Sequence, residues 1–183
     1  MNAEARLETL RRILYGNGET QVYAILDGAS IPNLLLLLAE HQVEHVCLYR
    51  GDLDPDLAQA APYLVHLPEE SSFSRLFLRG GWGQHWGILA LSKEGLRALR
   101  MHFRKFLMVW DPDGKPLYFR YYDPRVLRVY LPTCNGDELQ TVFGPVSAYV
   151  LEGEKPDVLL RFTRAGHALG QTELALPPNQ PAG

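Results

Sequence analysis

Four short apolar segments, separated from one another by segments of helical character, constrain the fold of this chain most. The apolar segments span residues 22–26, 45–49, 63–67 and 86–91. The helical segments lie near residues 31–39, 55–60, 73–78 and 93–104. This alternation is typical of an α/β sheet with helical crossovers, in which strands joined by a helix run in the same direction. We therefore predict an α/β fold with a mixed, largely parallel sheet and flanking helices.

The pattern changes after residue 106. Residues 106–110 and 117–122 resemble strands and flank Asp111-Pro112-Asp113-Gly114, a sequence that favours a tight turn. We expect an antiparallel hairpin near 106–122 that joins the sheet. Because side chains alternate along a strand, this prediction places Tyr118, Arg120 and Tyr122 on one face.

The length of 183 residues fits one domain with a short appendage. We expect an α/β domain over residues 1–145, followed by a short C-terminal hairpin extension over residues 146–176. Residues 177–183, which contain three prolines and no apolar periodicity, are predicted to be a disordered tail.

The charge balance limits the classes of partner. With 18 basic and 21 acidic side chains the net charge is −3, which argues against nucleic-acid binding because that requires a basic surface. The longest apolar run, near residues 34–39, is far shorter than a membrane span, and the charged N-terminus differs from a signal peptide. We therefore expect a reduced, cytoplasmic protein that binds neither nucleic acid nor membrane.

Three side chains are candidates for catalysis. Asp27 ends the first predicted strand, where α/β enzymes hold catalytic groups, and Asp123 and His102 could join it in one cleft. A small α/β hydrolase-like enzyme using Asp27, Asp123 and His102 is therefore the alternative function. The competing interpretation is structural, with a turn at Asp27 and a half-buried, hydrogen-bonded His102.

The sequence contains no recognisable motif for a cofactor or a metal. The glycine-rich segment 80–87 precedes a strand, whereas a phosphate-binding loop lies between a strand and a helix N-terminus. Cys47 and Cys134 are far apart and lie in no metal-type spacing. We expect no cofactor and no metal.

Basic and aromatic side chains supply candidates for partner binding. Arg97, Arg100 and Arg104 follow one side of the predicted helix 93–104, which forms either a solvated face or a docking strip for an acidic partner. Trp82 and Trp86 could form a partner surface, although large aromatic side chains usually belong to the core.

The segment Arg120 to Arg125 combines charge with aromatic side chains. Arg120 and Tyr122 can stack and hydrogen-bond at once, and Arg125 follows Asp123 and Pro124, which suit the end of a strand. We predict an Arg120–Asp123 pair that fixes this turn. Arg120, Tyr122 and Arg125 are also candidates for partner contact.

Seven blocks of the chain, in order, resemble the effector adaptors of bacterial type VI secretion. The blocks span residues 23–29, 47–51, 61–67, 86–92, 99–107, 113–127 and 143–146. The most specific of them contains Phe119-Arg120-Tyr121-Tyr122-Asp123-Pro124-Arg125.

The resemblance implies a cytoplasmic, non-enzymatic chaperone without a small-molecule substrate. Such an adaptor binds a cognate toxic effector and loads it onto the valine–glycine-repeat spike protein. It also implies that Asp27, His102, Asp123 and Pro124 belong to motifs that hold the fold. Many members carry a further lobe after the last block, and we expect that lobe to be short or missing here.

Overall fold

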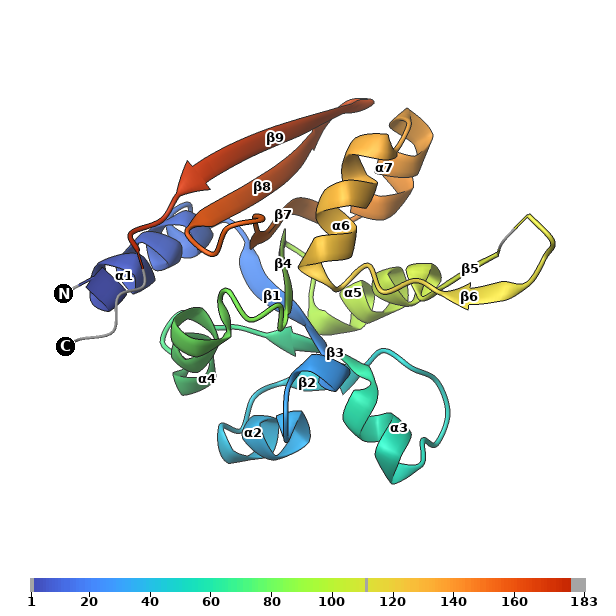
Figure 1. The fold of residues 1–183 in the computed structure, drawn as a ribbon, viewed down its shortest axis with the longest axis horizontal. Coiled ribbons are helices and arrows are strands. Elements are labelled where there is room, and N and C mark those ends of the chain that lie inside the picture. Colours follow the sequence, from blue (N-terminus) through green and yellow to red (C-terminus); the bar gives the residue numbers. More distant parts are fainter. Residues whose placement is uncertain (1, 111, 179–183) are drawn as a thin grey trace.

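The computed structural model describes residues 2–110 and 112–178, and in these residues the fold is built around a seven-stranded sheet with the order β2-β3-β1-β4-β7-β8-β9 (Figure 1). Its strands are β1 (Gln21–Asp27), β2 (His45–Cys47), β3 (Pro62–His66), β4 (Gly87–Ser92), β7 (Val146–Glu152), β8 (Val158–Ala165) and β9 (Ala168–Ala175). A separate two-stranded sheet consists of β5 (Met108–Trp110) and β6 (Pro116–Tyr118).

Helices and short turns connect these strands, and polar side chains determine where several helices begin. Asp54, Ser71, Asp123 and Asn135 each accept a hydrogen bond from a first-turn N–H, which satisfies a backbone donor that the helix leaves unpaired. The helices are α1 (Asn2–Tyr15), α2 (Leu34–Glu40), α3 (Pro55–Ala60), α4 (Ser72–Leu76), α5 (Leu96–Phe103), α6 (Pro124–Tyr130) and α7 (Gly136–Phe143).

The prediction of a largely parallel sheet is wrong, because every strand pair among the described residues is antiparallel. Two of the helical connections do join strands of the same direction, but those strands are not neighbours. The connection through α2 joins β1 to β2, and β3 lies between them in the opposite direction. The connection through α4 likewise joins β3 to β4 across β1. Each of these two crossovers therefore skips one place in the sheet, whereas the connection through α3 joins the antiparallel neighbours β2 and β3.

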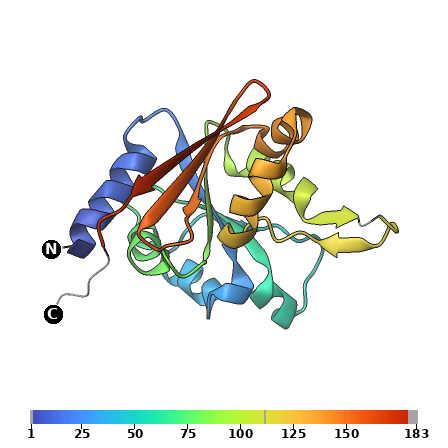
Figure 2. The same cartoon turned by 45° about the horizontal axis from the view of Figure 1, so that its top comes forward.

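The antiparallel hairpin expected near 106–122 is present as β5 and β6, but it stands apart from the main sheet. Its pairs are Met108 with Tyr118, Val109 with Leu117, and Trp110 with Pro116. The hairpin projects from the body of the molecule in Figures 1 and 2.

Helices cover both faces of the sheet. Val22 and Ala24 of β1 belong to the apolar cluster on one face, together with α1, α2 and α4. Tyr23 and Ile25 of the same strand point to the other face and pack with α5, α6 and α7. β1 is therefore buried on both sides, which explains why its sequence is a continuous apolar run.

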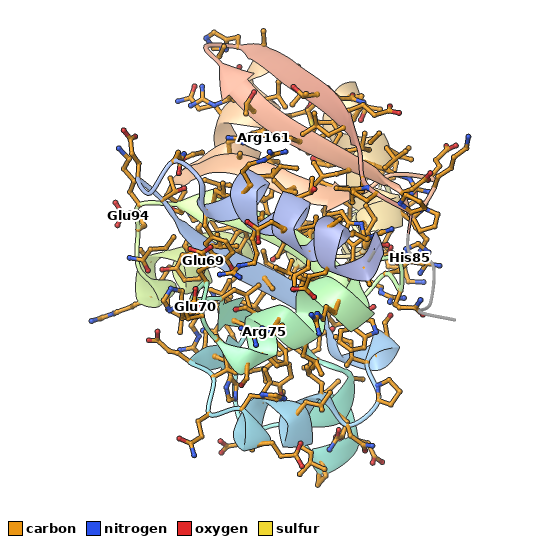
Figure 3. All side chains as sticks on the ribbon, turned by 90° about the vertical axis from the view of Figure 1, so that its left-hand side faces the viewer. Glu69, Glu70, Arg75, His85, Glu94 and Arg161 are labelled. Carbon is orange, nitrogen blue, oxygen red and sulfur yellow. The ribbon has the colours of Figure 1, made fainter. Side chains whose placement is uncertain are left out.

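Ion pairs fasten α1 to the segment before α4. Arg11 lies 3.2 Å from Glu69 and 2.7 Å from Glu70, and Figure 3 shows both carboxylates beside α1. Exposed pairs such as these contribute little energy, so α1 is held mainly by the burial of Leu7, Leu10 and Leu14.

The segment after residue 145 supplies β7, β8 and β9 to the main sheet. A domain boundary at residue 145 stays a prediction. In the predicted tail, Pro177 accepts a hydrogen bond from Arg6 at 3.4 Å, and residues 179–183 lie outside the described residues. None of the helices in the described ranges combines the length and the apolar composition needed to cross a bilayer.

Gly87, at the start of β4, offers a test of this packing. A Cβ at this position would overlap the carbonyl oxygen of Ile25 in the neighbouring strand, so we expect Gly87→Ala to lower the free energy of unfolding by about 1–3 kcal/mol. Urea denaturation measures this loss. The control is Gly80→Ala, where a Cβ meets nothing within 4 Å, and an equal loss in both variants would contradict the packing.

Candidate functional site

A buried carboxylate at the end of β1 is the centre of the candidate site. The Asp27 side chain is 1% exposed and forms an ion pair with Arg120. It also accepts hydrogen bonds from the Ala29 N–H at 3.1 Å and from the Ser30 hydroxyl at 2.7 Å. These bonds give Asp27 the turn role that the sequence suggested, because they hold the loop that follows β1.

The guanidinium of Arg120 reaches this carboxylate from the segment between β6 and α6. Burial lowers its pKa, but the hydrogen bond and the charge of Asp27 outweigh burial and raise the pKa overall. Arg120 is 46% exposed at its side chain, so water reaches one part of the pair. Asp27 is therefore the fully buried partner and Arg120 the solvated one.

The predicted Arg120–Asp123 pair is wrong. Asp123 binds Arg125 instead, with 3.0 Å from Arg125 Nε to Oδ1 and 2.7 Å from Nη2 to Oδ2. Asp123 also caps α6 and precedes Pro124, the first residue of that helix. Burial raises the pKa of Asp123, but the bonds from Arg125 lower it overall. The turn itself is closed by the backbone, with 3.0 Å from Asp123 N to Arg120 O.

The tyrosines do not follow the predicted alternation because β6 ends at Tyr118. Tyr118 is exposed, whereas Tyr121 and Tyr122 are buried in the core. Burial raises the pKa of Tyr122, and the neighbouring Tyr49 raises it further. Tyr122 is therefore a core side chain that lies beside Asp27 and Arg120 and packs in the apolar cluster that also contains Tyr121.

His102 lies elsewhere, on α5. Its Nε2 donates to the carbonyl oxygen of Val142 at 2.9 Å, and its ring packs against Phe103 and Phe106. Burial lowers the pKa of His102. Among the described residues, neither Asp27 nor Asp123 hydrogen-bonds to His102, and each carboxylate is bound to an arginine. The arrangement does not bring together the three groups that the hydrolase-like alternative requires.

The three arginines of α5 and its end have different surroundings. Arg97 is exposed and Arg100 is half buried. Arg104 donates to the carbonyl oxygens of Leu48 at 2.9 Å and of Tyr49 at 2.5 Å. It therefore holds the loop after β2, a role that no sequence signal indicates because its acceptors are backbone atoms.

Both tryptophan candidates lie on the other face of the sheet. Trp82 is buried in the apolar cluster of that face, and the half-buried Trp86 packs against it next to Phe77. Both side chains therefore contribute to the core on this face. The contact of Trp82 and Trp86 with a partner stays a prediction.

Glu152 is a buried charge that the sequence did not point to. It ends β7, accepts from the Gly83 N–H at 2.8 Å and lies 2.9 Å from the Nδ1 of His85, which Figure 3 labels. Burial raises the pKa of Glu152 despite these partners. A single glutamate at a strand end carries no spacing signal, so only the fold shows that it fixes the 83–85 loop.

In the part of the chain that the structure describes, no group of three His, Cys, Asp or Glu side chains could hold a metal ion. His41 and His45 are four residues apart, but His41 follows α2 and His45 begins β2. They bind Ser72 and the Val43 carbonyl instead.

An open pocket lies at the base of the β5–β6 hairpin. It measures about 450 Å³, and its lining combines apolar side chains with two cations, namely Leu53, Leu57, Met108, Tyr118, Arg50 and Arg104. Burial lowers the pKa of Arg104, and the charges of Arg100 and Arg50 lower it further. The guanidinium groups of Arg50 and Arg104 therefore lie among apolar side chains in this pocket.

The structure defines a class of protein with an antiparallel sheet that is covered by helices on both faces. In this class of protein, buried charged side chains fix strand ends and loops. A family model described as a domain of unknown function (DUF4123) matches residues 22–141, more than half of the chain. This chain belongs to the DUF4123 family. No curated protein and no solved structure matches it.

The Asp27–Arg120 pair predicts an asymmetry in stability. Arg120→Met leaves a buried carboxylate without its cation and should cost about 2–4 kcal/mol, whereas Asp27→Asn leaves an arginine that water reaches and should cost less. Chemical denaturation of both single variants and the double variant measures the coupling. Equal losses, or a loss below about 0.5 kcal/mol for Arg120→Met, would contradict a structural role.

His102 predicts a dependence of stability on pH. Because its pKa is lowered from the ordinary 6.5 in the folded protein, the unfolded chain binds the extra proton as the pH falls below about 6.5. Stability relative to His102→Gln should therefore decrease from pH 7 to pH 5 and stay constant above pH 7.5. Unfolding free energies of both proteins across this range measure the effect, and a constant difference would rule it out.

Proposed function

We propose that this protein is a non-enzymatic adaptor that binds a cognate toxic effector in the cytoplasm and loads it onto the type VI secretion spike protein. Membership of the DUF4123 family supports the proposal, since this family is linked to type VI effector adaptors. The proposal adds the binding event, its partners and its place in the cell.

The observation that carries the proposal is the apolar surface of the β5–β6 hairpin. All six of its strand residues are exposed, and the large apolar ones are Met108, Val109, Trp110, Leu117 and Tyr118. Trp110 is 67% and Tyr118 69% exposed. A two-stranded ribbon gains little stability by itself, and a contiguous exposed apolar patch usually marks a protein-binding surface.

The pocket beside the hairpin indicates the chemistry of the bound segment. Apolar side chains of a partner can enter between Leu57, Met108 and Tyr118, and carboxylates can pair with Arg50 and Arg104 at the rim. The bound segment of the effector is thus apolar with flanking acidic residues. Arg104 also holds the loop after β2. It therefore fixes part of the pocket wall and supplies part of the positive charge of the pocket.

The remaining basic candidates fit this proposal unequally. Arg97 and Arg100 line a second hollow on the same helix, α5, and Arg125 is partly exposed beside Asp123. We assign them to the edge of the partner surface, where charges accelerate association more than they add affinity. Arg120 and Tyr122 act mainly by holding the base of the hairpin.

Trp110→Ser should weaken effector binding without changing the fold. The experiment captures tagged protein from the native cells, identifies what elutes by mass spectrometry, and then measures binding of the purified effector by calorimetry. We expect wild type to bind and Trp110→Ser to lose at least tenfold in affinity, because a central aromatic anchor contributes about 2 kcal/mol or more.

The matched control is Leu36→Ser, which removes an exposed apolar side chain on α2, 59% exposed, far from the hairpin in sequence. It should bind as wild type does, and both variants should keep the wild-type melting temperature. A folded wild-type protein that binds no effector would overturn the adaptor function. An effector bound equally by Trp110→Ser would overturn the assignment of the hairpin.

A further inference from the structure

The two edges of the main sheet differ in a way that the adaptor function does not use. One edge strand, β2, has three residues, whereas the other, β9, has eight. Edge strands expose backbone groups that can pair with another strand, and short edges are one protection against this. The long β9 edge lies on the outside of the molecule in Figures 1 and 2.

The turn between β8 and β9 determines which backbone groups of β9 face outward. Gly166 and His167 form a two-residue loop, with Gly166 at φ 60, and Ala165 pairs with Ala168. The closing pair of such a loop is hydrogen-bonded, and hydrogen-bonded pairs then alternate along the ladder. The N–H and C=O groups of four residues therefore point away from β8, namely Leu169, Gln171, Glu173 and Ala175.

Nothing in the described residues occupies this row of groups. No backbone or side-chain hydrogen bond of the described chain ends on the outward groups of Leu169, Gln171 or Glu173. The strand contains no Pro, Lys or Arg, and its pairing with β8 has no bulge. The devices that usually protect an edge are therefore absent from β9, apart from the single charge of Glu173.

We propose that β9 pairs antiparallel with β9 of a second copy of this chain, which joins the two sheets into one continuous sheet across a two-fold axis. A two-fold pairing must match outward groups with outward groups, so the two residue numbers of each pair sum to an even value. Only a few registers satisfy this condition, and their side-chain pairs distinguish them.

The register centred on Thr172 is the best of these. It places Thr172 opposite Thr172 of the second copy, a favourable pair, and Gln171 opposite Glu173. Leu169 then meets Ala175, so apolar side chains face each other as well. A register centred on Glu173 instead opposes two carboxylates and is unfavourable. The sequence of β9 is thus self-complementary in one register.

This interface is independent of the proposed effector-binding hairpin. The β5–β6 hairpin and β9 occupy different parts of the molecule in Figure 1, so each surface can be changed without the other. Dimerisation can therefore fail while effector binding succeeds, and the reverse also holds. A dimer would present two hairpins to its partners.

Sedimentation velocity of the purified full chain at micromolar concentrations tests the proposal. Wild type should show a reversible monomer–dimer equilibrium. Thr172→Lys opposes two like charges at the axis and should weaken the dimer about tenfold, while the exposed side chain leaves the fold unchanged. The control Thr172→Val keeps a β-branched pair and should dimerise as wild type does. A monomer at all concentrations overturns the proposal, and leaves the edge to a strand of another protein.

Disulfide trapping tests the register. At a non-hydrogen-bonded pair the Cα atoms are about 4.5 Å apart, which suits a disulfide, so Thr172→Cys should form a covalent dimer under mild oxidation. Gln171→Cys is the control, because its Cα atoms would be more than about 7 Å apart in this register. Wild type, with Cys47 and Cys134, sets the background. A dimer that forms no disulfide at Thr172 and resists Thr172→Lys overturns the assignment to β9.

Discussion

A single buried charge, the carboxylate of Asp27, constrains much of this structure. A carboxylate inside a sheet covered on both faces needs a cation and hydrogen-bond donors, since burial without them is costly. The cation is Arg120, 93 residues further along the chain. This contact brings the segment before α6 against the end of β1, and with it Tyr121 and Tyr122 enter the core. The base of the β5–β6 hairpin is thereby fixed.

The hairpin itself is the opposite case. Its base is anchored by Arg120 and by Leu107, whose carbonyl oxygen accepts from the Phe119 N–H at 3.0 Å. Its strand residues are exposed, although the ring of Tyr118 contacts that of Tyr49. An apolar ribbon on a rigid base costs little to order when a partner covers it. Neighbouring parts of one segment thus have different roles. Arg120 stabilises the fold, whereas Trp110 is exposed to solvent and is available to a partner.

Local patterns in the sequence predicted many of the strands and helices, because those elements depend on residues that are close together in the chain. The apolar segments 22–26, 63–67 and 86–91 coincide with β1, β3 and β4, and the two segments flanking the turn sequence near 111–114 predicted the β5–β6 hairpin. The predicted strand direction was wrong, because the alternation of strands and helices does not specify the strand order. A helical connection can lead to the neighbouring strand or to the strand one place further on. The predicted partner of Arg120 was wrong for a similar reason. Asp123 is close to Arg120 in the sequence, but the buried carboxylate of Asp27 requires a cation and pairs with Arg120.

The sequence by itself determined the positions of most strands and helices, the apolar character of the hairpin, and the resemblance that led to the DUF4123 family. Those properties depend on residues close together in the chain, so their periodicity and turn chemistry are visible in the sequence. Only the tertiary structure decided the strand order, the antiparallel pairing, the partners of Asp27 and Glu152, and which strands form the edges of the sheet. These depend on contacts between distant segments, whose selection rests on the packing of the whole core.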